Sequence, residues 1–166
     1  MKRVVVTGMG VVSAVGNNFD DFWASIAAGT NGIDYITRFD TTDFRTKMGG
    51  EVRGFEAESY MDKKDAKRLP LFIQFALASA MMAHKDSGLN LELIDPYRIG
   101  VGVGSGIGGI CVMEENARLL MEKGPKRVSP FFVPFEIINM ASGRISMSCL
   151  LYTSDAADEG LGVDLG

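Results

Sequence analysis

The side chains best suited to nucleophilic or metal-binding chemistry are Cys111, Cys149 and His84. A cysteine thiolate is a strong nucleophile when a base or a positive charge lowers its pKa. One histidine and two distant cysteines cannot form a catalytic triad or a metal cluster. Cys111 lies between two apolar residues, and we expect it to be small, buried and inert. His84 is expected at a helix end, where it interacts favourably with the helix dipole.

The segment Gly104–Gly109 matches the dinucleotide-binding spacing G-x-G-x-x-G. It follows a predicted strand and precedes a predicted helix, which is the context that such a site requires. The segment lies far from the first strand, however, and Glu122 falls at the end of a predicted helix rather than at a strand end. Close packing of a strand on a helix explains the glycines without a ligand. A dinucleotide-binding oxidoreductase stays as an alternative function, although we expect no cofactor and no metal.

Three basic residues, Lys64, Lys67 and Arg68, are spaced i, i+3 and i+4 and share one face of a predicted helix. Spacing alone favours a solvated helix surface. The functional alternative is a docking surface for an acidic partner, because a local basic face in a chain of net charge −4 permits electrostatic steering.

Composition favours a globular protein rather than a nucleic-acid or membrane protein. The chain has 166 residues, of which 46% are apolar and 23% charged. Acidic residues outnumber basic ones by 21 to 17, which argues against nucleic-acid binding. No apolar run approaches the roughly 20 residues of a membrane span, and the start of the chain does not resemble a signal peptide. With two distant cysteines, we expect a cytoplasmic protein.

The elements that position these residues alternate between strands and helices. A buried strand is predicted at Val4–Val6, and a helix capped by Asn18 ends at Gly29. Loops with short strands follow at residues 32–55. Ser59 is expected to cap a short helix.

A second helix is expected to carry Pro70 in its first turn, to be buried on most faces and to end at Gly88. Residues 97–103 are predicted to form a strand that runs into the glycine turn. An amphipathic helix then ends at Gly124. A loop with Pro130 and Pro134 precedes an apolar helix.

In order along the chain, these segments resemble one family, the β-ketoacyl-acyl carrier protein synthases, and type II synthases most of all. The resemblance extends from Met1 to about Ile145, with Pro70 as a departure before the aromatic helix. The segments that carry it are "KRVVVTGMGVVSAVGNN", "FDTTDFRTKMGGEV", "FIQFALASA", "DSGL", "RIGVGVGSGIGG" and "GPKRVSPFFVPFEIINMASGRIS".

The resemblance implies that residues 1–147 form an incomplete amino-terminal half of a thiolase-like fold, α/β in class, with layered α-β-α-β-α architecture. It implies a homodimeric acyltransferase of fatty acid biosynthesis that performs decarboxylative Claisen condensation. The partner is acyl carrier protein, loaded with an acyl or a malonyl group, and no cofactor is consumed. The family's nucleophilic cysteine and two histidines find no match in this chain, so we expect the chain alone to be inactive. A non-catalytic relative, such as a chain-length factor, remains a second alternative.

The resemblance assigns only peripheral roles to residues of this chain. Ile107 matches a position that lines the acyl pocket. Phe132 and Val133 match a loop that extends toward the pocket of the dimer partner. The basic residues Lys64, Lys67 and Arg68 match positions that dock the acidic carrier protein.

After about Met147 the family pattern stops. The string "CLLYTSDAADE", which begins at Cys149, resembles the translation of a transposon-end adapter used in sequencing libraries. We therefore expect residues 148–166 to be a non-native tail. The alternative is a genuine, divergent tail in which Cys149 is a redox or nucleophilic residue. Without further strands, open sheet edges would leave the chain aggregation-prone or partly folded.

Overall fold

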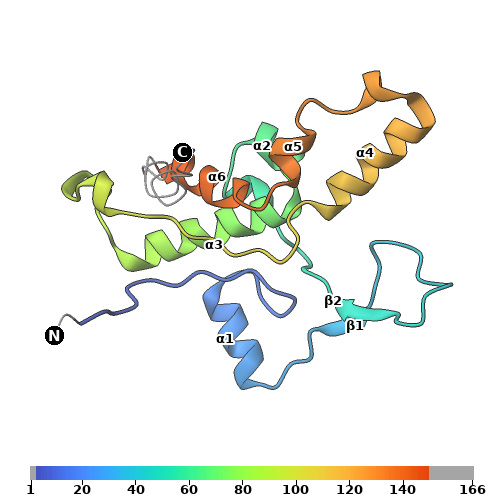
Figure 1. The fold of residues 1–166 in the computed structure, drawn as a ribbon. Helices are drawn as coiled ribbons and strands as arrows, with labels where there is room; N and C mark the ends of the chain where they lie inside the picture. The colour runs from blue at the N-terminus through green and yellow to red at the C-terminus, as the bar shows by residue number, and fades with distance from the viewer. Residues whose placement is uncertain (1–2, 150–166) are drawn as a thin grey trace, which may run out of the picture. The chain divides into compact units, whose positions relative to one another are not determined.

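The computed structural model describes residues 3–149, in a mixture of helices and short strands (Figure 1). It divides into two compact units, and helix α3 (Leu71–Ser87) contributes to both. The first unit comprises the described residues up to Lys63 together with Ala78–Leu89. The second comprises Lys64–Leu77 and the described residues from Asn90 onward. No helix within the described residues is long and apolar enough to cross a membrane.

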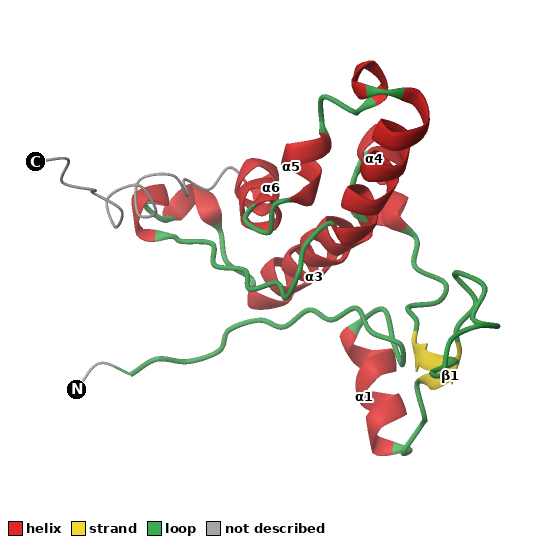
Figure 2. Cartoon of the chain, turned by 45° about the vertical axis from the view of Figure 1, so that its right-hand side comes forward, coloured by secondary structure: helices red, strands yellow, loops and turns green. Residues whose placement is uncertain are grey.

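The first unit contains α1 (Phe19–Ala27), a 3₁₀ turn (Ala57–Ser59) and the strands β1 (Ile33–Tyr35) and β2 (Met48–Gly50). The two strands pair antiparallel, with Asp34 opposite Gly49, and Figure 2 shows them as a small ribbon. The predicted boundaries of α1 are confirmed. The Asn18 side chain accepts a hydrogen bond from the Asp21 amide, and Gly29 follows the helix with a φ of 68°.

The predicted strand at Val4–Val6 is wrong, because the structure has a loop there, with Val4 93% exposed. A strand needs a neighbour to satisfy its backbone, and the only sheet among residues 3–149 is the β1–β2 pair. The glycines that follow serve another purpose. A Cβ atom on Gly8 or Gly10 would clash with a backbone carbonyl of α3, so both glycines allow close approach to that helix.

The second unit is helical in the residues that the structure describes. Its elements are α2 (Lys63–Arg68), the first part of α3, 3₁₀ turns (Leu91–Leu93, Pro96–Arg98 and Pro125–Arg127), α4 (Ile110–Lys123), α5 (Phe132–Glu136) and α6 (Met140–Cys149). The buried apolar side chains of this unit include Leu69, Ile73 and Leu77 before and on α3, and Ala141 and Ile145 on α6. This core sets the position of the helices that surround it.

Several predicted details of these helices are corrected. Ser59 ends the 3₁₀ turn and is separated from α2, so it is not a helix cap. Pro70 precedes α3, and its carbonyl accepts the amides of Ile73 and Gln74. The prediction that α3 is buried on most faces is confirmed, because only Leu71, Met81, Lys85 and Asp86 of this helix are exposed and its other residues are buried or half-buried. Its end before Gly88, with a φ of 62°, is confirmed.

The predicted strand at residues 97–103 is also wrong. A 3₁₀ turn, Pro96–Arg98, precedes an irregular segment that leads into the glycine turn. The physical reason is the same as at the amino terminus, since no described strand lies alongside to accept its hydrogen bonds. Alternation of small and apolar residues indicates the propensity for a strand, but a sheet requires partners.

Candidate functional site

The glycine turn before α4, Gly104–Gly109, is held by hydrogen bonds that two of its backbone amides donate. The Gly108 amide donates to the Ser105 hydroxyl at 3.1 Å, and the Gly109 amide donates to the Glu136 carbonyl at 3.0 Å. A dinucleotide site needs amides at a helix start that are free to bind phosphate. Because these two are taken by the protein itself, the geometry does not favour the dinucleotide-binding alternative.

The same turn lies in close contact with the end of α5. A Cβ atom on Gly109 would clash with the Phe135 carbonyl oxygen and lie 2.9 Å from the Glu136 Cα atom. Gly108 has a φ of 79°, and a Cβ atom there would lie 2.6 Å from the Glu136 carbonyl oxygen. Glycine is therefore required at both positions for packing. Ile107 precedes this contact and is 63% exposed.

Phe132 and Val133 begin helix α5, where the sequence predicted a loop. The Phe132 amide donates to the Ser129 carbonyl at 3.0 Å, which starts the helix despite Pro134 in its interior. Phe132 is half-buried, whereas Val133 is 58% exposed. The bond from Gly109 to the last residue of α5 joins the segment of Ile107 to the helix of Phe132 and Val133. The structure thus places the three predicted pocket residues on two directly connected segments of one unit.

The basic residues Lys64, Lys67 and Arg68 all lie on α2 and are exposed. Two contacts hold this helix in place. The Asp65 carboxylate pairs with the Arg144 guanidinium of α6 at 3.4 Å. The Nε2 atom of the buried Gln74 side chain donates to the backbone carbonyls of Ala66 and Leu69.

Arg68 makes a contact that the sequence did not reveal. Its guanidinium carbon lies 4.5 Å from the centre of the Phe131 ring, a cation–π geometry. Phe131 also stacks on Phe135 at 5.6 Å between ring centres. The basic helix therefore meets the residue that immediately precedes α5. Sequence spacing shows the periodicity of one helix but carries no signal for such a pairing between helices.

Cys111 lies on α4 in the second unit, and His84 lies on α3 in the first. The expectation that Cys111 is buried is wrong, because it is exposed on α4, in an open hollow lined also by Glu114, Glu115 and Arg118. The neighbouring residues Ile110 and Met113 are exposed as well. His84 lies in the last turn of α3, as predicted. Cys149 is the last residue of α6, and the tail that follows lies outside the described residues. No cluster of potential metal ligands occurs among the residues described.

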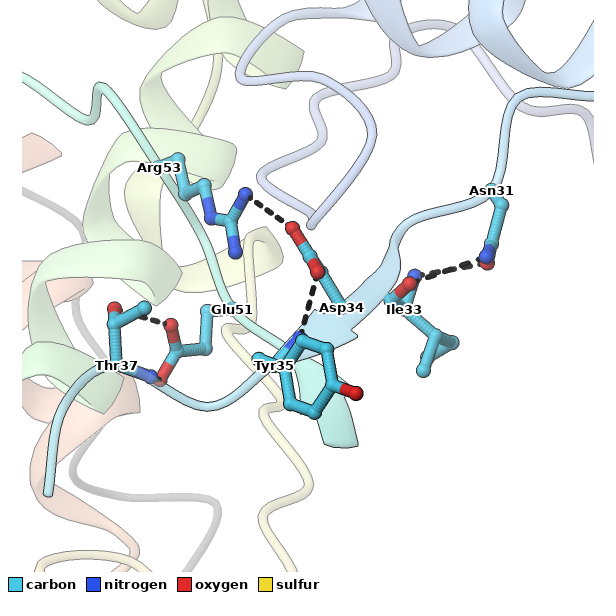
Figure 3. Close-up of polar contacts among 7 residues, drawn as sticks. All are labelled: Asn31, Ile33, Asp34, Tyr35, Thr37, Glu51 and Arg53. Atoms are coloured by element: carbon cyan, nitrogen blue, oxygen red, sulfur yellow. Dashed lines mark hydrogen bonds and ion pairs between the residues drawn. The ribbon is translucent and has the colours of Figure 1, made fainter. Parts of the chain in front are cut away.

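A polar network stabilises the β1–β2 pair (Figure 3). The Asp34 carboxylate accepts the Tyr35 amide at 2.7 Å and pairs with Arg53 at 3.0 Å. These contacts, the Tyr35 amide first, lower the pKa of Asp34. Glu51 accepts the Thr37 hydroxyl at 2.8 Å, and this bond is the main reason that the pKa of Glu51 is lowered. Asp34 is exposed and Glu51 is half-buried, and both carboxylates bond within the β1–β2 region, so the network is structural.

Comparison with known proteins identifies relatives over most of the chain. Residues 1–154 match the family model described as "Beta-ketoacyl synthase, N-terminal domain". The chain is 50% identical over 146 residues to the 3-oxoacyl-[acyl-carrier-protein] synthase 2 of Vibrio cholerae, and 46% identical over 146 residues to that of Coxiella burnetii. Each alignment spans 88% of this chain and 35% of the relative. The chain thus spans about a third of the length of these curated relatives.

Solved structures show the same fold. A β-ketoacyl synthase from Burkholderia phymatum matches with a TM-score of 0.74 at 24% identity, over 91% of this chain and 38% of that structure. A ketosynthase in complex with a type II polyketide acyl carrier protein matches with a TM-score of 0.73 at 22% identity, over 89% of this chain and 39% of that one. The fold is therefore that of the thiolase-like ketosynthases, as the resemblance implied. The chain belongs to the β-ketoacyl synthase family and lies within its amino-terminal domain.

Proposed function

We propose that this chain is the amino-terminal part of a type II β-ketoacyl-acyl carrier protein synthase that elongates fatty acids. The observation that carries the proposal is the 50% identity over 146 residues to a synthase of that type. The occupied amides of the glycine turn count against the oxidoreductase alternative.

The proposed reaction is a decarboxylative condensation in two stages. An acyl group first passes from its carrier-protein thioester to a cysteine thiolate, and the carrier leaves as a free thiol. Malonyl-acyl carrier protein then loses carbon dioxide, and the resulting carbanion attacks the acyl carbonyl. The carbon–sulfur bond to the cysteine breaks, which yields 3-oxoacyl-carrier protein and regenerates the thiolate. The cysteine and two histidines that the family uses are proposed to lie outside these 166 residues, so the chain by itself performs no condensation.

The described residues supply two supporting surfaces. Ile107 is proposed to line the acyl pocket, and Phe132 and Val133 are proposed to extend toward the pocket of the dimer partner. The bond from the Gly109 amide to the Glu136 carbonyl joins their segments. The second surface is basic helix α2, with Lys64, Lys67 and Arg68, and it is proposed to bind acyl carrier protein. Its exposure and its anchoring to α3 and α6 suit a docking surface.

The full-length protein is further proposed to be a cytoplasmic homodimer. Ile107, Phe131 and Val133 leave apolar area exposed in the second unit, which a partner subunit would cover. Light scattering on the purified full-length protein tests this, with a dimer mass expected and a monomer mass contradicting it.

The experiment that tests the proposed activity compares the 166-residue chain with the full-length protein from the same gene. Each is incubated with acyl- and malonyl-carrier protein, and 3-oxoacyl-carrier protein is quantified. The full-length protein is expected to form product and the short chain to form none. Product from the short chain would contradict the assignment of the nucleophile. A full-length protein that lacks the nucleophile and forms no product would instead support the chain-length-factor alternative.

Residues 148–166 are proposed to be a non-native tail. Sequencing the source DNA across the codons for Met147 to Gly160, without adapter ligation, tests this. A reading frame that continues into a strand and a cysteine motif supports the proposal. The string "SCLLYTSDAADEG" in the genomic sequence would refute it and make Cys149 a residue to mutate.

A further inference from the structure

Asn116 is the buried polar residue of helix α4, at 6% exposure. Asparagine is a poor helix former in a helix interior, and a buried amide is costly unless it is hydrogen-bonded. Both ends of this side chain are bonded. Its Nδ2 donates to the Val112 carbonyl of the same helix at 2.8 Å, and its Oδ1 accepts the Ser129 amide at 2.9 Å.

Ser129 connects Asn116 to the start of α5 through two further hydrogen bonds. Its hydroxyl accepts the Phe131 amide at 3.1 Å, and its carbonyl accepts the Phe132 amide at 3.0 Å. A single side chain on α4 therefore fixes the residue that organises the first turn of α5.

Helix α4 and the turn before it hold α5 at both ends. The amino-terminal contact is Asn116 with Ser129, and the carboxy-terminal contact is the Gly109 amide with the Glu136 carbonyl. Phe132 lies between these two contacts. The Gly109–Glu136 hydrogen bond joins two backbone groups. The Asn116–Ser129 hydrogen bond involves a side chain, so a substitution at Asn116 can remove it without changing the backbone.

We propose that Asn116 is a positioning residue that limits the length of acyl chain the enzyme accepts, an inference that rests on the function proposed above. It does not touch the acyl chain. Its Oδ1 holds the Ser129 amide, and through Ser129 it holds the pocket residues Phe132 and Val133. Without this acceptor the half-buried Ser129 amide has no partner, so the start of α5 shifts and the pocket wall yields to longer chains.

The test measures kcat/KM of the full-length protein for octanoyl- and hexadecanoyl-carrier protein. Asn116→Ala is expected to raise the hexadecanoyl-to-octanoyl ratio about tenfold, the lower end of the scale on which hydrophobic pockets discriminate. Asn116→Asp keeps an oxygen for the Ser129 amide but loses the bond to the Val112 carbonyl, so it is expected to cost stability while keeping the ratio within about twofold of the wild type. Ala78→Gly, which weakens α3 at a fully buried position, is the reference for a loss of stability alone. It is expected to lower both rates in parallel.

Two results would overturn the inference while leaving the proposed function intact. One is an unchanged ratio in Asn116→Ala, and the other is a parallel loss of both rates as in Ala78→Gly. If the wild-type protein performs no condensation, the proposed function fails, and hydrogen exchange then decides the positioning role. The Ser129 and Phe132 amides are expected to exchange faster in Asn116→Ala than in Asn116→Asp. Equal exchange in the two variants would refute the role.

Discussion

The substitution Gly109→Ala tests whether the glycine turn is a packing device. The added Cβ atom would clash with the Phe135 carbonyl oxygen and lie 2.9 Å from the Glu136 Cα atom. Both neighbours are backbone, so neither can rotate away, and α5 must move. Overpacking of this kind costs about 1–3 kcal/mol. Loss of the 3.0 Å bond from Gly109 to Glu136 adds about 1 kcal/mol. We expect the free energy of unfolding to fall by about 2–4 kcal/mol.

The matched control is Gly106→Ala in the same turn. Nothing lies within 4 Å of a Cβ atom at Gly106, and its φ is not in the left-handed region. Alanine there is expected to be neutral or to stabilise by up to about 1 kcal/mol, through a less flexible unfolded chain. Urea unfolding followed by circular dichroism measures both variants. Equal midpoints for the two alanine variants would show that Gly109 is not required for packing, and so would a Gly109→Ala protein as stable as the wild type.

Three further predictions test other parts of the structure. Asn18→Ala removes the cap of α1 and should lower the free energy of unfolding in urea by about 1 kcal/mol, whereas Asn18→Ser should recover most of that loss. A loss below a few tenths of a kcal/mol in Asn18→Ala would argue against the cap. Glu51 should titrate below its ordinary pKa of 4.5, so the stability it contributes is present above that pH and lost as pH falls through the lowered value. Carbon NMR should show its midpoint rise toward 4.5 when Thr37 is replaced by valine, and no rise would count against the hydrogen bond. Lys67→Glu should raise the KM for acyl-carrier protein about fivefold at low salt, more than Lys123→Glu on α4; equal effects would show that α2 is not the docking surface.

Helix boundaries were the part of the fold that local sequence predicted best. Asn18 and Gly29 delimit α1, and Gly88 and Gly124 end two other helices, because caps and left-handed glycines act within a single turn. The prediction of a strand at Val4–Val6 was wrong because a strand, unlike a helix cap, does not depend on local sequence alone. A strand depends on neighbours that local propensity does not specify, and residues 3–149 provide none beside it.

In the candidate site too, local features were predictable from the sequence and contacts between elements were not. The periodicity of α2 placed its basic residues correctly on one helix. The contacts that connect helices were not predictable, since Arg68 with Phe131 and Asn116 with Ser129 depend on tertiary packing. One sequence signal for the Asn116 contact was available. Asn116 lies at helical spacing from the apolar residues Val112 and Met113, and a polar residue on an apolar helix face indicates a buried hydrogen bond.

The assignment to the condensing synthases is tested by intact-protein mass spectrometry of the full-length protein after incubation with hexadecanoyl-carrier protein. We expect a mass gain of one acyl group, held as a thioester that hydroxylamine cleaves. Added malonyl-carrier protein should discharge the acyl group with release of carbon dioxide. A protein that acquires no acyl group and releases no carbon dioxide would contradict the assignment to the condensing synthases.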